Sequence, residues 1–339
     1  MQQAPDGLFG YGDPRGSVDL RTILSSYLAR VRGVLAPREQ ICVSTGFAQA
    51  LRLACDIFRA KGIRRVAIED PSHPQMRNLI TRAGMALMPI PVDEQGIRVD
   101  ELAKSGARAV VVGPAHQYPL GVVMSPQRRA ALVRWARDRD GLIVEDDYDA
   151  EFRYDRAPIG AVQGLAPEYV LHVGTVSKSL APGLRLGWLS APSKLVSTVM
   201  EIKSTYDIHS PVLDQLTIAH LIETGRFDRH IRKVRQQYRA RRDTIVEAIT
   251  AKFPDVRVRG ISAGIHVLVE LPSDISEDAA VSCAAAHSVR CVGLAGHYAI
   301  PGPRTPGLVL GYTSTAPHSL GPAIRALLRG LEDARCAAR

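Results

Sequence analysis

Short apolar runs alternate with helical segments between residues 41 and 191 of this chain. The run at residues 142–144 lacks the polar alternation of a strand with one wet face, which is typical of strands buried on both faces of a parallel sheet. The runs fall at residues 41–44, 65–69, 86–92, 109–113, 142–144, 169–173 and 185–191. About seven strands joined by helices predict an α/β fold, with a mostly parallel sheet covered by helices on both faces.

The pattern changes beyond residue 193, where helical segments prevail. A long basic helix is expected from residue 225 to 243, and a small α+β unit follows it. That unit is predicted to contain strands at residues 264–271, 289–292 and 308–311 and a helix at 322–331. Because 339 residues exceed the usual size of one domain, we expect two. The expected parts are an N-terminal arm and helix (1–32), a large domain (33–205), and connecting helices with a small C-terminal domain (206–339).

Lys178 lies in a loop between two predicted strands, in the stretch HVGTVSKSLAPGLRLGW (172–188). Thr175 and Ser177 precede it, and Arg185 follows seven positions later. Hydroxyls and an arginine can hold a phosphate, and a partly desolvated lysine amine can attack a carbonyl to form a Schiff base. Lys178 is therefore the predicted nucleophile. The alternative is a solvated loop lysine, which is what most lysines are.

The apolar run at residues 142–144 ends in Glu145, Asp146 and Asp147, and Tyr148 follows. In open α/β sheets, ligands bind beyond the carboxyl ends of the strands. A carboxylate there can pair with a protonated heterocyclic nitrogen, and a tyrosine two residues later can hydrogen-bond a ring oxygen. The alternative is a plain acidic turn, which is the weaker interpretation once Lys178 is taken into account.

A strand at residues 41–44 runs through a glycine turn into a helix, so free backbone N–H groups meet the positive end of a helix dipole. The amides of Gly46, Phe47 and Ala48 are therefore candidate phosphate donors. The turn is neither a P-loop nor a GxGxxG fingerprint, because the required glycines and the GK[ST] sequence are missing.

Six ordered motifs resemble the aminotransferase-type domain of the MocR group of bacterial regulators, which is similar to fold-type I, class I and II pyridoxal 5'-phosphate aminotransferases. The similarity runs from about residue 9 to residue 331, and six motifs in order are far more specific than one. The motifs are FGYGDPRG (9–16), EDPSHP (69–74), PAHQYPLGVVMS (114–125), VEDDYDAEFRY (144–154), GTVSKSLAPGLRLGW (174–188) and GRFDRHIRKVRQQY (225–238).

The resemblance implies a role for each matching residue. Lys178 would carry pyridoxal 5'-phosphate as a Schiff base and later move the substrate's α-proton. Asp146 would keep the pyridine nitrogen protonated, and Tyr148 would hydrogen-bond the phenolic oxygen. The residues implied to hold the phosphate are Thr175, Ser177 and Arg185, together with the turn at 46–48.

Three further roles come from the same resemblance. His73 stands where a tyrosine more usually stacks on the pyridine ring, and an ordinary loop histidine is the alternative. Either His116 or Gln117 is expected to donate a hydrogen bond near the ring oxygen. Tyr11 is expected to reach the cofactor phosphate of a neighbouring subunit, which implies a homodimer, or else to pack in a turn.

The chain departs from the family pattern in two places. Val309 stands where an arginine usually clamps the substrate carboxylate; the nearby Arg304 is a candidate to replace it, but Gln75 and Val309 leave no clear clamp. MocR proteins also carry a winged helix-turn-helix before this domain, whereas this chain begins almost at FGYGDPRG. We therefore expect a transaminase that acts on a small amine or amino acid, or alternatively an effector domain that binds cofactor and amine without turnover.

Composition argues against several other classes of protein. The formal charge is +9 with an isoelectric point near 9.5, but the arginines are spread through helical segments and aromatic residues are only 5%. We therefore expect no nucleic-acid binding by this chain alone. The five cysteines form no CxxC pair, which predicts neither a metal site nor a disulfide framework and fits a reducing cytoplasm. Neither a signal peptide nor a membrane span is apparent, so a soluble cytoplasmic protein is expected.

Overall fold

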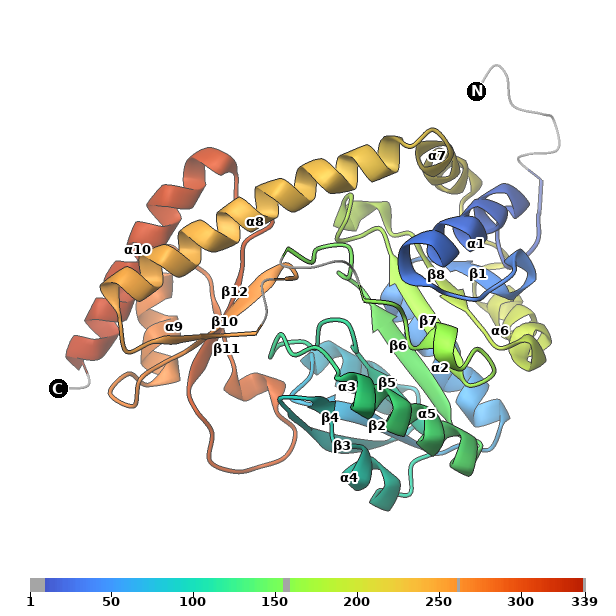
Figure 1. The fold of residues 1–339 in the computed structure, drawn as a ribbon, viewed down its shortest axis with the longest axis horizontal. Coiled ribbons are helices and arrows are strands. Elements are labelled where there is room, and N and C mark those ends of the chain that lie inside the picture. Colours follow the sequence, from blue (N-terminus) through green and yellow to red (C-terminus); the bar gives the residue numbers. More distant parts are fainter. Residues whose placement is uncertain (1–9, 155–158, 261–262, 338–339) are drawn as a thin grey trace.

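An eight-stranded sheet forms the centre of the larger part of the molecule (Figure 1). The computed structural model describes residues 10–154, 159–260 and 263–337. The strand order is β1-β8-β7-β6-β5-β2-β3-β4. The strands are β1 (Ile41–Ser44), β2 (Arg65–Asp70), β3 (Ala86–Asp93), β4 (Gly96–Ile97), β5 (Ala109–Val112), β6 (Leu142–Asp147), β7 (Val170–Thr175) and β8 (Gly187–Ser190).

The strands from β7 to β3 pair in parallel, whereas β8, β1 and β4 join in antiparallel fashion. The predicted mostly parallel sheet is therefore confirmed. Its eighth strand, β4, was not predicted, because two residues are too short to show a periodicity.

Helices cover both faces of this sheet, because successive side chains of each strand point to opposite faces. Val144 of β6 packs in the cluster that contains α2 (Phe47–Ala60), whereas Ile143 packs in the cluster that contains α5. On the first face lie also α3 (Pro74–Arg82) and α6 (Val196–Asp207); on the second lie α4 (Val99–Lys104) and α5 (Pro126–Arg139). The unbroken apolar runs in the sequence reflect this double burial.

The helices α1 (Val18–Arg32) and α7 (Val212–Glu223) pack together around β1 and β8. From there α8 (Arg226–Lys252) runs as one helix to the smaller part of the molecule (Figure 1). The predicted long basic helix is confirmed and is longer than expected. Short 3₁₀ turns lie at Arg38–Gln40, Gln163–Leu165, Pro182–Leu184, Ser193–Leu195 and Ala295–His297.

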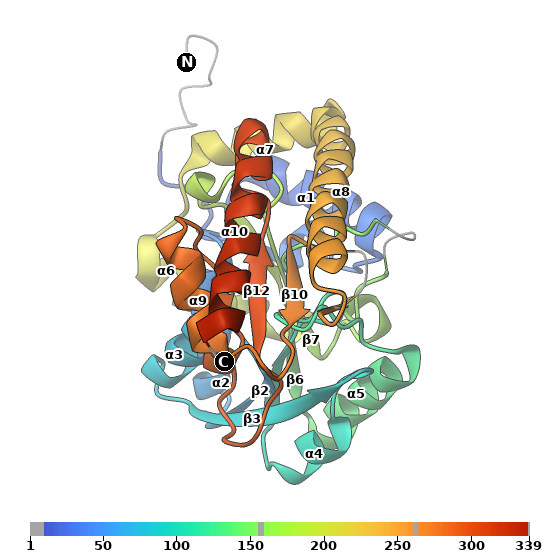
Figure 2. The same cartoon turned by 90° about the vertical axis from the view of Figure 1, so that its left-hand side faces the viewer.

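A four-stranded antiparallel sheet forms the smaller part, in the order β11-β12-β10-β9. Its strands are β9 (Arg257–Arg259), β10 (His266–Glu270), β11 (Val292–Gly293) and β12 (Gly307–Gly311). The end of α8, α9 (Glu277–Ala286) and α10 (Pro317–Ala337) pack against it (Figure 2). Three details differ from the sequence prediction: β9 is an additional strand, β11 lies at Val292–Gly293 and not at residues 289–292, and the last helix begins at Pro317, with Pro322 inside it.

All five cysteines are free thiols, in agreement with the unpaired spacing of the cysteines in the sequence. Among the helices of the described residues, none combines the length and the apolar character that crossing a bilayer requires.

Candidate active site

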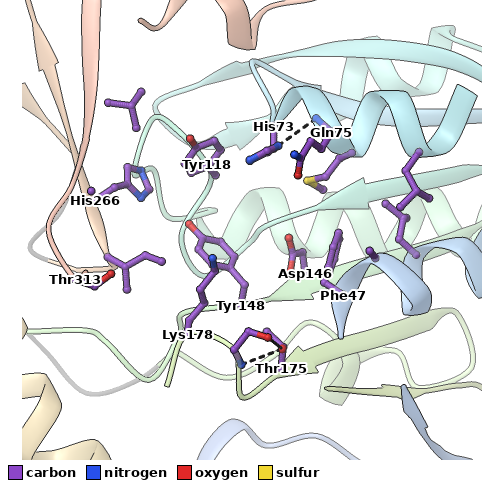
Figure 3. A pocket seen from close by; sticks show the side chains of 18 of the residues that line it. Phe47, His73, Gln75, Tyr118, Asp146, Tyr148, Thr175, Lys178, His266 and Thr313 are labelled. Atoms are coloured by element: carbon purple, nitrogen blue, oxygen red, sulfur yellow. Dashed lines mark hydrogen bonds between the residues drawn. The ribbon is translucent and has the colours of Figure 1, made fainter. Parts of the chain in front are cut away.

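A cavity of about 480 Å³ opens where the carboxyl ends of the parallel strands face the first turns of α2 and α3 and the smaller sheet (Figure 3). This is the position at which open α/β sheets bind ligands. The residues predicted from the sequence that line it are Phe47, Ala48, His73, Asp146, Tyr148, Thr175, Ser177, Lys178 and Arg185. His73 and Tyr118 lie on one side of the space, and Asp146, Tyr148 and Lys178 lie on the other.

The three acids at the end of β6 have separate surroundings because side chains alternate along a strand. Glu145 accepts hydrogen bonds from the backbone N–H groups of Val162 (2.8 Å) and Gln163 (2.9 Å). Asp147 accepts two hydrogen bonds from Arg32, at 2.7 and 2.8 Å. Of the three acids, Asp146 alone lines the cavity.

The Asp146 carboxylate has a buried Oδ1 atom with no hydrogen-bond partner among the described residues. Burial, together with the nearby charges of Asp149 and Asp147, raises the pKa of Asp146 well above its usual value. A buried carboxylate without a partner costs free energy, and a cation beside it would offset that cost. The cavity therefore presents a carboxyl group whose ionised form a protonated partner would stabilise.

Tyr148 and Lys178 both line the cavity (Figure 3). Lys178 lies in the turn after β7. Burial, and then the charges of Asp149 and Asp146, raise the pKa of Tyr148 well above 10. Tyr148 is therefore a neutral phenol at physiological pH and can donate a hydrogen bond.

The start of α2 and the loop around Arg185 make a cradle for an anion. Gly46 has a φ of +100°, and an added Cβ there would lie 3.0 Å from Nη2 of Arg185. The guanidinium thus lies beside the free N–H groups at the first turn of the helix. Thr175 and Ser177 complete this side, with their hydroxyl oxygens 3.0 Å apart and both side chains buried.

The loop after β5 contributes Tyr118 to the cavity, and not His116 or Gln117. The Gln117 amide donates hydrogen bonds to the backbone oxygens of Pro71 and Tyr118, both at 2.7 Å. His116 lies behind the cavity wall with Nδ1 2.8 Å from Oδ2 of Asp149. Tyr118, which the sequence did not single out, lies against His73 with the ring centres 5.5 Å apart.

His73 is the N-cap of α3, and its Nδ1 accepts a hydrogen bond from the backbone N–H of Gln75. Burial and the nearby charges of His297 and Lys178 lower the pKa of His73. The ring is therefore uncharged near neutral pH, which suits stacking on another ring.

Tyr11 lies away from the cavity and is 86% exposed, with an edge contact to His209. Val309 lines the cavity, whereas the guanidinium of Arg304 stacks on the Tyr298 ring at 3.7 Å. Among the described residues that line the cavity, Arg185 is the sole arginine. A substrate carboxylate therefore meets no second guanidinium in the described part of the wall.

This fold and this cavity define an aminotransferase-type protein. Residues 1–300 match the family model of aminotransferase class I and II, and the chain belongs to that family.

Two groups of proteins are similar to this chain, transcriptional regulators by sequence and aminotransferases by structure. The uncharacterized HTH-type transcriptional regulator YdeL of Bacillus subtilis is 34% identical, over 86% of this chain and 63% of its own length. The probable rhizopine catabolism regulatory protein MocR of Rhizobium meliloti is 28% identical, over 95% of this chain and 65% of its own length. Kynurenine aminotransferase from Pyrococcus horikoshii is 25% identical, with a TM-score of 0.86 over 98% of this chain and 84% of its own. The resemblance to MocR-type domains is confirmed, and the chain spans less than two thirds of either regulator.

Proposed function

We propose that this chain binds pyridoxal 5'-phosphate through Lys178 and transfers the amino group of a small amine or amino acid. The observation that carries this proposal is that Oδ1 of Asp146, in the cavity that also contains Lys178, has no hydrogen-bond partner among the residues that the structure describes. A protonated pyridine nitrogen at that oxygen would offset the cost of the buried carboxylate. When bound, the cofactor supplies an electron sink for the charge left on the substrate carbon.

The proposed roles of the side chains follow from their positions. The Lys178 amine attaches the cofactor and, once an incoming amine has displaced it, takes and returns a proton at the substrate carbon. Tyr148 donates a hydrogen bond to the ring oxygen, and His73, with Tyr118 beside it, stacks on one face of the ring. Arg185, with the first turn of α2 and the hydroxyls at 175 and 177, holds the phosphate.

The proposal extends to assembly and location. A homodimer would bring Tyr11, which is exposed here, to the phosphate of a neighbouring subunit. The division into a large domain (33–205) and a small one (206–339) is supported by the two separate sheets. A cytoplasmic location is supported by the five free thiols.

A second candidate function is an effector domain that binds cofactor and amine without completing turnover. It is favoured by the relative YdeL, which is 34% identical to this chain and is a transcriptional regulator. This chain covers 63% of the length of that regulator. The two functions share the same Lys178 chemistry and differ in whether the amino group is passed on.

Two measurements test the proposal. Borohydride reduction of the cofactor-loaded protein, followed by peptide mass spectrometry, should place the label on Lys178; Lys178→Ala should abolish it, and the exposed control Lys194→Ala should not. A label on another side chain would overturn the proposal. The loaded protein is then mixed with a panel of amines, and conversion of the absorbance to that of the aminated cofactor is followed. Conversion supports the transaminase, whereas binding without conversion supports the effector domain.

A further inference from the structure

Behind Tyr148, outside the cavity lining, two buried side chains hold its hydroxyl. Nδ1 of His116 lies 3.2 Å from the Tyr148 hydroxyl oxygen and 2.8 Å from Oδ2 of Asp149. Both His116 and Asp149 are almost fully buried, at 4% and 2% exposed. His116 comes from the loop after β5, and Tyr148 and Asp149 come from the segment directly after β6.

The positions of the hydrogens follow from the acceptors. A carboxylate accepts hydrogen bonds, so the proton between His116 and Asp149 lies on Nδ1. That N–H is shared with the Tyr148 oxygen, which then acts as acceptor; the Tyr148 O–H can donate to Asp149 in the cofactor-free protein or turn to a partner in the cavity. A hydrogen bond accepted by a hydroxyl makes that hydroxyl a better donor, because the dipoles of a hydrogen-bond chain reinforce one another.

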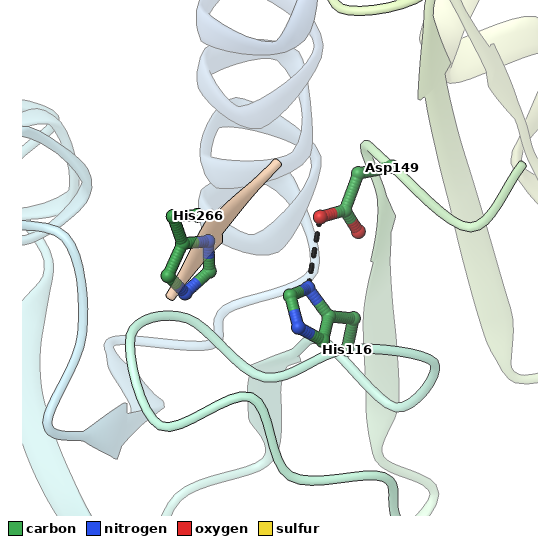
Figure 4. A group of neighbouring side chains, drawn as sticks. All are labelled: His116, Asp149 and His266. Carbon is green, nitrogen blue, oxygen red and sulfur yellow. Dashed lines mark hydrogen bonds and ion pairs between the residues drawn. The ribbon is translucent and has the colours of Figure 1, made fainter. Parts of the chain in front are cut away.

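The smaller sheet closes this group from the other side. An added Cβ at Gly264 would lie 2.0 Å from Cε1 of His116, so the backbone before β10 lies directly against the imidazole. The His266 ring lies 5.0 Å from the His116 ring (Figure 4). Nε2 of His266 donates a hydrogen bond to the backbone oxygen of Pro119 at 3.1 Å, which fixes the ring. The His116 imidazole therefore has little freedom to turn.

We infer that His116, held by Asp149, is a positioning residue that directs the O–H of Tyr148 toward the ring oxygen of the bound cofactor. The inference rests on the proposed function, in which Tyr148 meets that oxygen. His116 does not touch the cofactor in this arrangement, because it is outside the cavity lining. Its effect reaches the cofactor only through Tyr148.

A metal site is the competing interpretation of the same residues. Ligand atoms of His116, Asp149 and His266 all lie within 4.8 Å of one another, and Nδ1 of His266 has no hydrogen-bond partner among the described residues (Figure 4). The 2.8 Å hydrogen bond between His116 and Asp149 already satisfies two of the three ligand atoms, however. We therefore assign this group to Tyr148, and metal content becomes one outcome of the test.

The test is a pH titration of the absorbance of the lysine-linked cofactor in the loaded protein. A hydrogen bond to the ring oxygen favours the form without a proton on the Schiff-base nitrogen, so weakening it should raise the apparent pKa of the chromophore. We expect His116→Leu to raise this pKa by about one unit, the effect of losing one hydrogen bond. His116→Asn places an amide N–H near the position of Nδ1 and should restore much of the shift. Asp149→Asn should give a smaller shift in the same direction.

The Tyr148→Phe background makes the test specific, since it removes the hydroxyl through which His116 acts. There His116→Leu should add no further shift. An unchanged pKa in folded His116→Leu protein, or an equal shift in the Tyr148→Phe background, would overturn the inference while leaving the Lys178 proposal intact. If the chromophore of the loaded wild-type protein is not attached to Lys178, the proposed function itself is overturned. Zinc bound stoichiometrically to purified wild-type protein, and lost in His116→Asn, would also overturn the inference.

Discussion

At the scale of single residues, the end of β6 shows how position decides what a carboxylate does. Asp146 and Asp147 are chemically identical neighbours, yet Asp146 lines the cavity with an Oδ1 that has no hydrogen-bond partner in the described part of the chain, and Asp147 lies between Arg32 and His172. The pKa of Asp147 is held well below its usual value, against burial, mainly by the Arg32 guanidinium and the hydrogen bond to His172. The first carboxylate is available for a ligand, and the second stabilises the fold.

This contrast predicts opposite effects of the same substitution on the cofactor-free protein. Asp147→Asn breaks a buried ion pair and should lower the free energy of unfolding by about 3–5 kcal/mol. Asp146→Asn removes a buried carboxylate whose raised pKa makes its charge unfavourable, so this variant should be at least as stable as wild type at pH 7. Urea denaturation of both variants measures the difference. Equal losses in the two would contradict the assignment.

A second prediction concerns the cavity wall at Val309. An arginine there would give a substrate carboxylate the bidentate partner that the described lining lacks. Val309→Arg should therefore improve binding of L-alanine at least about tenfold relative to ethylamine, which has no carboxylate. Competition binding of L-alanine and ethylamine to the cofactor-loaded protein measures both affinities. The matched control is Val18→Arg at the start of α1, since Val18 is half exposed and is not among the residues that line the cavity.

The sequence identified Lys178, Asp146 and Tyr148 as a set, and the structure brings all three into one cavity. The sequence did not single out Tyr118, which lies in an irregular loop. Residue types show which side chains of a strand share a face, but they do not show the path of a loop. Three consecutive side chains, at 116, 117 and 118, were all possible there. Tyr118 enters the cavity because the other two side chains have partners elsewhere. His116 is bonded to Asp149, and Gln117 is bonded to the backbone of Pro71.

At the scale of elements, the first turn of α2 combines a backbone requirement with a binding role. Gly46 begins the helix with φ +100°, and Gly62 follows its end with φ +70°. An added Cβ is strained at both positions, but only at Gly46 would it meet another group, the Arg185 guanidinium. Substitution of Gly62 therefore introduces backbone strain alone, whereas substitution of Gly46 introduces strain and also affects the candidate phosphate site.

Gly46→Ala and Gly62→Ala should each lower the free energy of unfolding by about 1 kcal/mol or somewhat more, because alanine rarely adopts positive φ. Only Gly46→Ala should also weaken cofactor binding, by about tenfold, since it displaces one phosphate partner. Denaturation and equilibrium titration with pyridoxal 5'-phosphate give the two quantities. Equal affinities in the two variants would show that the first turn of α2 does not hold the phosphate.

The long elements were predictable from sequence for a plain physical reason. Strands buried on both faces, such as β6, are apolar throughout, and α8 repeats its apolar positions over 27 residues. The short elements β4 and β9 have two and three residues, which is too few for a period. They exist because neighbouring strands offer them hydrogen bonds, and that information lies elsewhere in the chain.

At the scale of the whole molecule, histidine side chains lie at the contact between the larger and the smaller part. His266 of β10 lies against His116 and Tyr118 of the larger part, and its Nε2 donates a hydrogen bond to Pro119. Burial, and then the neighbouring His116, lower the pKa of His266 to about 3. The contact between the two parts therefore requires a neutral imidazole at this point.

A neutral buried histidine makes stability depend on pH in a known direction. The unfolded chain binds a proton at His266 below about pH 6.5, whereas the folded protein does not until about pH 3. The unfolded state thus holds more protons in this window, and stability falls as the pH falls through it. Between pH 7 and 4.5, His266 alone should remove about 2–3 kcal/mol from the free energy of unfolding.

His266→Gln keeps an N–H group for the backbone oxygen of Pro119 but takes up no proton. Between pH 7 and 4.5, its free energy of unfolding should therefore fall by about 2–3 kcal/mol less than that of wild type. Urea denaturation at pH 7 and pH 4.5 measures the difference for each protein. His73 and His297, whose pKa values are also lowered, act in the same direction, and Glu69, whose pKa is raised to about 8, acts in the opposite one. All three are present in both proteins and cancel in the comparison. The exposed His318→Gln should match wild type, and an unchanged fall in His266→Gln would show that the junction of the two sheets accepts a charged imidazole.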